Sequence, residues 1–254
     1  MASPEVEFER AVTAFRARKF GQARKLIRKL ERQVGPQPPF VHLIGFIELE
    51  SGDTTRAVDA LSQAATAFPN DANVFNGLGI AHRRLGNFAA ARRAFENALR
   101  IDSTHGPFFR NLGNLLSQAG EVEAAINAYC QALERDPDDG AAVRALSEDL
   151  ERSGDRAAAL GVLEDFLQRQ RHDVETLICL TALQLRALNL GAAEDGYRRA
   201  LDIDPGNDVA VAGLMIVRTL RGDVEGALVA ARAAGLAERA SPAAGSAYVF
   251  AMNY

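Results

Sequence analysis

A repeat of 34 residues runs through nearly the whole chain and constrains its fold more than any other feature. The clearest column holds alanine at all seven positions, Ala23, Ala57, Ala91, Ala125, Ala159, Ala193 and Ala227. The repeats that this period defines are 4–37, 38–71, 72–105, 106–139, 140–173, 174–207 and 208–241. Self-similarity at this interval indicates a small structural unit that buries its apolar face by stacking on its neighbours.

Each repeat reads as two helices. In the third repeat, apolar residues between Phe75 and Leu85 recur at helical spacing. Gly86 is expected to end this helix, because glycine accepts the left-handed conformation at a helix end. A second apolar stripe, from Phe88 to Leu99, predicts a second helix behind the first.

Two glycines in the third repeat, Gly77 and Gly79, begin like the turn that holds a dinucleotide pyrophosphate. Such a turn must follow a strand and open a helix, where backbone N–H groups are free. Here the glycines fall inside a predicted helix, and His82 stands where a third glycine is needed. The small residue at position 79 is therefore expected to let the two helices pack closely.

The order large apolar, Leu-Gly, Gly-Asp/Asn, Ala and Asp-Pro within 34 residues resembles the tetratricopeptide repeat. The resemblance covers residues 4–241 and departs at Arg18 and Leu188, where glycine is usual. It implies an all-α fold, a right-handed superhelical solenoid of antiparallel helix pairs over residues 1–241. Such solenoids are stabilised mainly between neighbouring repeats and carry a concave binding groove.

The resemblance also implies that the first helix of each repeat lines this groove. Its middle is basic and rich in amides, between two apolar shoulders, so we expect it to bind the backbone and carboxylates of an extended peptide. The alternative is that these side chains are simply solvated, since exposed charge is common. The candidate residues are Asn76, Arg83, Arg84, Arg110, Asn111, Asn114, Gln118, Arg144, Arg152, Phe46, Ile178 and Leu185.

The sequence contains no candidate catalytic residues. No nucleophile, base and orienting group stand together, and no histidine pair has metal-ligand spacing, so neither an enzyme, a cofactor nor a metal site is expected. The stretches at 136–140 and 202–208 hint at calcium loops but have the wrong spacing. Both cysteines stand alone and no apolar run is long enough to span a membrane, which favours a cytoplasmic protein.

The expected function is therefore a protein–protein interaction scaffold that binds a peptide or protein segment, including one with acidic groups. A further interpretation rests on the first 37 residues, which hold nine Lys or Arg against four Glu. This basic run favours a solvated face on a terminal capping helix. The alternative is an adaptor for nucleic acid or an anionic membrane surface.

We expect residues 242–254 to form a partial helix or to be the start of a following region that is missing. Their apolar end does not read as a polar cap, which leaves self-association through this end as an expectation. The ending SAYVFAMNY is similar to the segment that joins repeats to the catalytic region in bacterial SPINDLY-like O-GlcNAc transferases. That resemblance implies an alternative in which the chain is the substrate-recognition arm of a larger enzyme.

Overall fold

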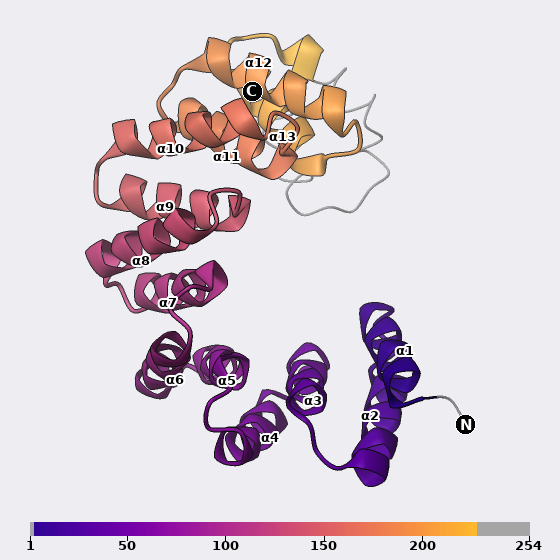
Figure 1. The fold of residues 1–254 in the computed structure, drawn as a ribbon. Coiled ribbons are helices and arrows are strands. Elements are labelled where there is room, and N and C mark those ends of the chain that lie inside the picture. The colour runs from indigo at the N-terminus through magenta and orange to yellow at the C-terminus, as the bar shows by residue number, and fades with distance from the viewer. Residues whose placement is uncertain (1–2, 228–254) are drawn as a thin grey trace. The chain divides into compact units, whose positions relative to one another are not determined.

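The computed structural model describes residues 3–227, and the regular elements in that range are α-helices in consecutive pairs (Figure 1). The first helices of the pairs are α1 (Pro4–Arg16), α3 (Pro38–Glu50), α5 (Ala72–Arg84), α7 (Gly106–Gln118), α9 (Gly140–Arg152), α11 (Val174–Arg186) and α13 (Asp208–Leu220). The second helices are α2 (Phe20–Val34), α4 (Thr54–Ala67), α6 (Phe88–Ile101), α8 (Val122–Arg135), α10 (Arg156–Arg169) and α12 (Leu190–Ile203). The predicted all-α class with paired helices is confirmed.

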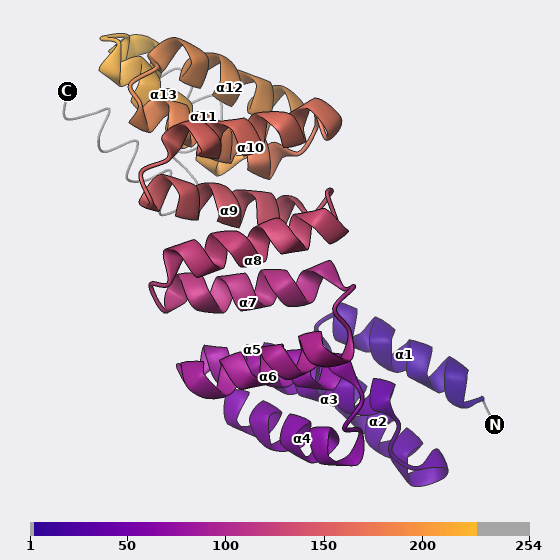
Figure 2. The ribbon, with the colours of Figure 1, turned by 60° about the vertical axis from the view of Figure 1, so that its left-hand side comes forward.

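The chain divides into two compact units, an N-terminal unit of residues 1–137 and a C-terminal unit that begins at residue 138. The N-terminal unit contains α1 to α8, and the described part of the C-terminal unit contains α9 to α13. Within each unit, successive helices pack on one another and the first helices of neighbouring pairs also touch (Figure 2). We call the surface made by α3, α5 and α7 the first-helix face of the N-terminal unit.

Left-handed residues separate the two helices of each repeat. Gly86, the second residue after α5, has a φ of 75°, and glycines at the equivalent places in four other repeats have φ between 81° and 92°. Arg18 and Leu188 occupy the same place with φ of 56° and 58°. The turn is thus kept where glycine is missing, although the left-handed region costs an L-residue about 1 kcal/mol or more.

Close packing between paired helices explains the small-residue columns. A Cβ at Gly79 would lie 2.5 Å from the ring of Phe95, and one at Gly113 would lie 2.6 Å from the ring of Tyr129. Ala91 is fully buried in the same layer. The glycines therefore make room for aromatic rings of the second helix, and α5 runs unbroken through Gly77 and Gly79, which confirms that these glycines form no phosphate-binding turn.

Asp and Asn residues at the repeat junctions cap helices. The carboxylate of Asp139 accepts a hydrogen bond from the Ala142 N–H of α9, at 3.1 Å. The Asn207 side chain accepts one from the Ala210 N–H of α13, also at 3.1 Å. These contacts assign the calcium-like stretches a capping role, which satisfies backbone donors at helix starts. Within residues 3–227, no group of three or more His, Cys, Asp or Glu side chains is placed to hold a metal ion.

Among the described helices, none is both long and apolar enough to cross a bilayer. The segment 242–254, on which the expectations of self-association and of a transferase arm rest, lies outside the described residues.

Candidate functional site

An amide pair links two neighbouring repeats on the first-helix face of the N-terminal unit. The Nδ2 of Asn111, on α7, donates a hydrogen bond of 2.8 Å to the Oδ1 of Asn76, on α5. Asn76 is only 8% exposed, whereas Asn111 is half-buried. Asn76 therefore holds the Asn111 amide in position, and it is Asn111 that presents polar groups at the surface.

A second amide on α7 is held from behind by a buried tyrosine. The Tyr129 hydroxyl, on α8, donates a hydrogen bond of 2.9 Å to the Oδ1 of Asn114. The ring of Tyr129 is buried against Gly113, so the missing side chain at Gly113 lets the hydroxyl reach through to the face. Asn114 is thus oriented by the core of its own repeat.

The two neighbouring arginines of α5 have different environments. Arg84 is exposed and donates to the Leu49 carbonyl and to the Glu50 carboxylate of the preceding repeat, both at 2.9 Å. Arg83 is half-buried, and no hydrogen bond or ion pair holds it among the described residues. Its Nε is enclosed without a partner. Burial and the neighbouring Arg84 lower the pKa of the Arg83 guanidinium, while Tyr129 raises it.

The remaining candidates of this unit differ in exposure. Arg110 is half-buried and Gln118 is exposed, both on α7. Phe46 is partly buried and packs against the apolar cluster that contains Leu49 and Leu61. Phe46 therefore contributes to the core between repeats.

In the C-terminal unit the candidate arginines are bound to carboxylates. The Nη1 of Arg144, on α9, lies 3.3 Å from the Asp173 carboxylate and donates to the Thr176 hydroxyl at 3.1 Å. Arg152 pairs with the buried carboxylate of Asp149 at 2.6 Å. Arg144 thus links α9 to the start of α11, whereas the Arg152–Asp149 pair lies within α9.

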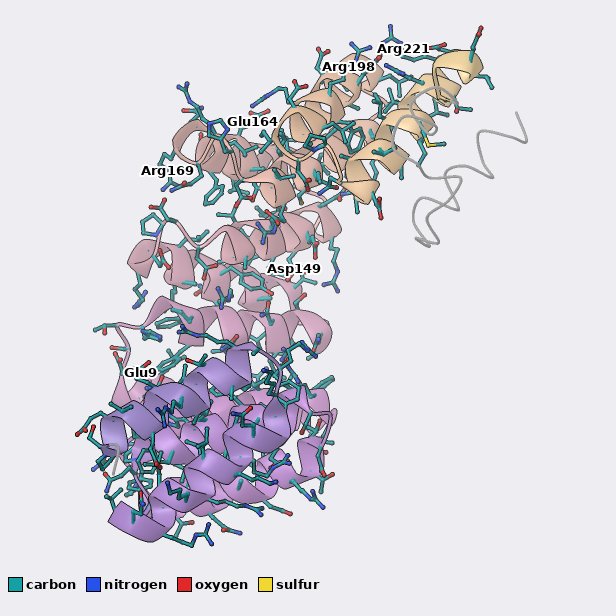
Figure 3. The ribbon with its side chains drawn as sticks, turned by 90° about the vertical axis from the view of Figure 1, so that its right-hand side faces the viewer. Glu9, Asp149, Glu164, Arg169, Arg198 and Arg221 are labelled. Atoms are coloured by element: carbon teal, nitrogen blue, oxygen red, sulfur yellow. The ribbon has the colours of Figure 1, made fainter. Side chains whose placement is uncertain are left out.

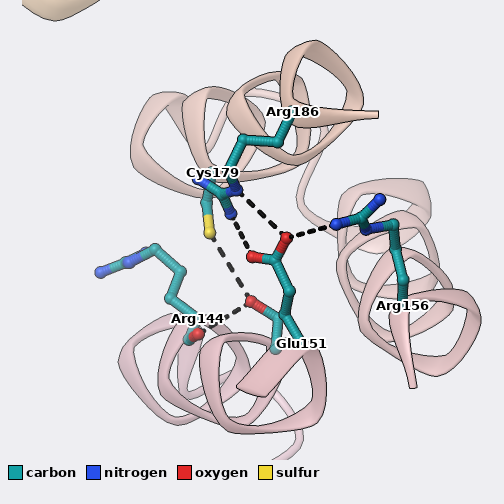
Figure 4. Close-up of polar contacts among 6 residues, drawn as sticks. Arg144, Glu151, Arg156, Cys179 and Arg186 are labelled. Carbon is teal, nitrogen blue, oxygen red and sulfur yellow. Dashed lines mark hydrogen bonds and ion pairs between the residues drawn. The ribbon is translucent and has the colours of Figure 1, made fainter. Parts of the chain in front are cut away.

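A carboxylate that sequence reasoning missed organises this unit. Glu151, at the end of α9, accepts two hydrogen bonds from Arg186 of α11, at 3.1 and 2.5 Å, and one from Arg156 of α10 at 3.3 Å (Figure 4). These arginines hold the pKa of the Glu151 carboxyl below its usual range, against the effect of burial. In the sequence, only the spacing of 35 residues between Glu151 and Arg186, one repeat plus one residue, indicates this ion pair.

The predicted apolar residues of this unit, Ile178 and Leu185, are half-buried on α11. Beside them, the Cys179 thiol lies 3.6 Å from the Ser147 hydroxyl (Figure 4), and burial raises the pKa of this thiol. A raised pKa disfavours the thiolate, which is the reactive form of cysteine.

Part of the basic run in the first repeat is used within the fold. Arg24 makes a bidentate ion pair with the buried Glu48, with both N–O distances 2.7 Å, and Lys29 pairs with the buried Glu7 at 2.5 Å. The buried side of α2 consists of Ala23, Ile27 and Leu30. The exposed basic residues of the same helix are Lys25, Arg28, Lys29 and Arg32.

The repeat pattern is found in known proteins. Residues 45–105 and residues 82–150 match two family models, each described as a tetratricopeptide repeat. The human tetratricopeptide repeat protein 7A is 27% identical over 94 residues, 37% of this chain and 11% of that protein. Superkiller protein 3 of Schizosaccharomyces pombe is 28% identical over 90 residues, 35% of this chain and 6% of that protein. The chain thus spans only a small part of the length of these curated relatives.

Solved structures with this fold cover more of the chain. Yeast Tom70 superposes with a TM-score of 0.74 at 16% identity, over 99% of this chain and 55% of that one. Pseudomonas aeruginosa pilF superposes with 0.66 at 16% identity, over 82% and 95%. YrrB, described as a tetratricopeptide protein with an unusual peptide-binding site, superposes with 0.54 at 18% identity, over 75% and 98%. Residues 45–150 therefore match tetratricopeptide repeats, and the paired helices of the described residues have the fold of these solved structures.

Proposed function

We propose that the chain is a non-catalytic interaction scaffold whose N-terminal unit binds an extended, acidic peptide segment along its first-helix face. The tetratricopeptide fold in general supports protein interaction, and one solved structure that resembles this chain is described as having a peptide-binding site. The observation that carries the proposal is Arg83, a half-buried cation for which the described residues supply no counter-ion.

Burying an unpaired charge is unfavourable, because the protein does not replace the hydration that the charge loses. Arg84, the next residue, shows that a guanidinium in this repeat can reach a carbonyl and a carboxylate. Arg83 makes neither contact. A carboxylate from a ligand would supply the missing partner through charge-assisted hydrogen bonds, which are about twice as strong as neutral ones.

The neighbouring amides suit the backbone of the same ligand. Asn111 uses its Nδ2 on Asn76, which leaves its Oδ1 as an acceptor. Asn114 uses its Oδ1 on Tyr129, which leaves its Nδ2 as a donor. One acceptor and one donor on the same helix match the alternating N–H and C=O groups of an extended peptide. Because both amides are fixed from behind, little conformational freedom is lost when the peptide binds.

The other candidate residues are expected to contribute less to ligand binding. Arg110 and Gln118 lie on α7 with the two amides, and Arg84 lies on the neighbouring α5. Arg144 and Arg152 are bound to Asp173 and Asp149 of their own unit, so a ligand would have to compete with those carboxylates.

The test selects ligands without assuming their sequence. Phage-displayed random dodecapeptides would be selected on the full chain, and the enriched peptides synthesised with a fluorescent label. We expect enrichment of Asp and Glu, and at least a tenfold weaker binding by Arg83→Glu in fluorescence anisotropy. Arg100→Glu, an equal charge change on an exposed residue of α6, serves as the matched control and should bind normally. Selection of peptides without acidic residues, or equal effects of both substitutions, would contradict the proposal.

A further inference from the structure

A second group of arginines, in the C-terminal unit, surrounds one buried carboxylate. Glu194 lies on α12 and is 8% exposed. Arg198 of the same helix lies 2.6 Å from it, the Nε of Arg218 on α13 lies 3.6 Å from it, and Arg221 directly after α13 also pairs with it. We call these four residues the Glu194 cluster.

The cluster carries an excess of positive charge. Three guanidiniums share one carboxylate, and no other carboxylate within residues 3–227 pairs with any of them. Arg218 also donates to the Gly226 carbonyl at 2.8 Å, but its Nε is enclosed without a hydrogen bond. Counted by direct ion pairs, the cluster therefore holds two more positive charges than negative ones.

The excess charge is accessible from solvent. The side chains of Arg198 and Arg221 are 53% and 50% exposed, while Arg218 is 19% exposed. Figure 3 shows Arg198 and Arg221 next to each other at the surface, reaching from α12 and from the end of α13. Both are anchored at one side by Glu194, so their remaining N–H groups are held close together for a ligand.

We propose that the Glu194 cluster is a binding site for a phosphate monoester. Such a group carries a charge of about −1.5 to −2 at neutral pH and three acceptor oxygens. It therefore matches an excess of two positive charges better than a single carboxylate does. Guanidinium groups also bind phosphate oxygens through paired N–H donors, a geometry that lysine does not offer. The proposal is independent of the peptide site of the N-terminal unit.

The Glu151 group of the same unit provides a matched comparison. There two arginines, Arg156 and Arg186, share one carboxylate, and both are about half exposed. The excess is only one positive charge. A double substitution at Arg156 and Arg186 therefore removes the same number of arginines from one glutamate as a double substitution at Arg198 and Arg221.

The test uses a fluorescein-labelled Gly-Ser nonapeptide with one central phosphoserine, its unphosphorylated form, and inorganic phosphate as competitor, at constant ionic strength. We expect the full chain to bind the phosphorylated peptide at least tenfold more tightly. Arg198→Gln with Arg221→Gln should weaken this binding at least tenfold, and Arg156→Gln with Arg186→Gln should weaken it less than twofold. Arg221→Lys, which keeps the charge but loses the paired donors, should weaken it severalfold with unchanged helicity.

The competitor identifies the source of the phosphate. Inorganic phosphate that displaces the peptide at equal concentration indicates a site for the free anion, and displacement only at much higher concentration indicates a phosphorylated protein segment. Both results support the proposal. It is overturned by equal binding of the two peptides, by undetectable binding, or by equal losses in the two double variants.

Discussion

One arginine on the first helices of the N-terminal unit differs from the ion-paired arginines on the first helices of the C-terminal unit. In the C-terminal unit, Arg144 and Arg186 are bound to carboxylates of their own unit. In the N-terminal unit, Arg83 is half-buried and unpaired among the described residues, beside amides that are fixed from behind. In the C-terminal unit these ion pairs stabilise the fold and leave the arginines with partners of their own. By contrast, Arg83 lacks a counter-ion among the described residues, which is the pattern expected where stability is given up for binding.

The comparison shows that the type of residue at a repeat position does not decide its role. Arg84 and Arg152 occupy equivalent places in their repeats, yet one reaches back to Glu50 of the preceding repeat and the other pairs with Asp149 of its own. What separates a structural arginine from a candidate ligand-binding one is the carboxylate within reach.

The largest loss of stability is expected where core glycines support the first-helix face of the N-terminal unit. Gly79→Ala and Gly113→Ala each force a Cβ against a ring, and each should lower the free energy of unfolding by about 1–3 kcal/mol. Only Gly113→Ala displaces Tyr129, whose hydroxyl orients Asn114. Urea unfolding should therefore show similar losses, while anisotropy should show weaker peptide binding for Gly113→Ala alone. Equal binding by the two variants would separate Asn114 from the site.

A smaller loss of stability is expected when the Glu151 ion pairs of the C-terminal unit are broken. Glu151→Gln removes the charge that holds Arg186 and Arg156, and should lower the free energy of unfolding by about 1–2 kcal/mol. Glu50→Gln, the control, removes a more exposed partner of Arg84 and should cost less than about 0.5 kcal/mol. Equal changes in urea unfolding would show that the C-terminal ion pairs do not stabilise their unit more than surface pairs do.

A still smaller change is expected at the two helix ends that lack glycine, one in each unit. Leu188→Gly and Arg18→Gly should each raise the free energy of unfolding by up to about 1 kcal/mol, because glycine adopts positive φ without steric strain. Leu188 is 73% exposed, so little packing is lost with its side chain. The reverse substitution, Gly154→Ala, should lower stability. Leu188→Gly that unfolds earlier than the parent chain would show that the turn is not strained.

Mild acid should affect the N-terminal unit through two histidines. Burial lowers the pKa of His42 against the opposing effect of Asp71, and burial with nearby Arg93 lowers that of His82. The unfolded chain then binds these protons first, so stability is present above about pH 6.5 and is lost as the pH falls below it. A double His42→Gln and His82→Gln variant should show a smaller fall in Tm between pH 7 and 5. An unchanged fall would assign the acid sensitivity to other groups.

Much of the fold follows from the sequence because it depends on periodic, local chemistry. The 34-residue period and the helix-ending glycines predict the paired helices, and the small residue at Gly79 predicts close packing, which Phe95 fulfils. The loss of glycine at Arg18 and Leu188 does not break the period, since packing of the flanking helices imposes the left-handed turn.

The candidate site was less predictable. Groove positions follow from the repeat register, but their partners do not, because an ion pair between repeats depends on the offset of two helices and on side-chain rotamers. Arg144 therefore looks like a groove residue in sequence, whereas in the fold it also donates to Thr176 of the next repeat. The support of Asn114 by Tyr129 was invisible for the same reason, since the hydroxyl acts from the second helix of the repeat.

One variant tests directly whether Arg83 is kept for a ligand at the expense of stability. Arg83→Met keeps the length and apolar stem of the side chain and removes the half-buried charge. Thermal unfolding and peptide anisotropy would be measured on the same preparation. We predict an unchanged or raised Tm together with at least tenfold weaker binding of an acidic peptide. A lowered Tm with unchanged binding would show that Arg83 serves the fold and not a ligand.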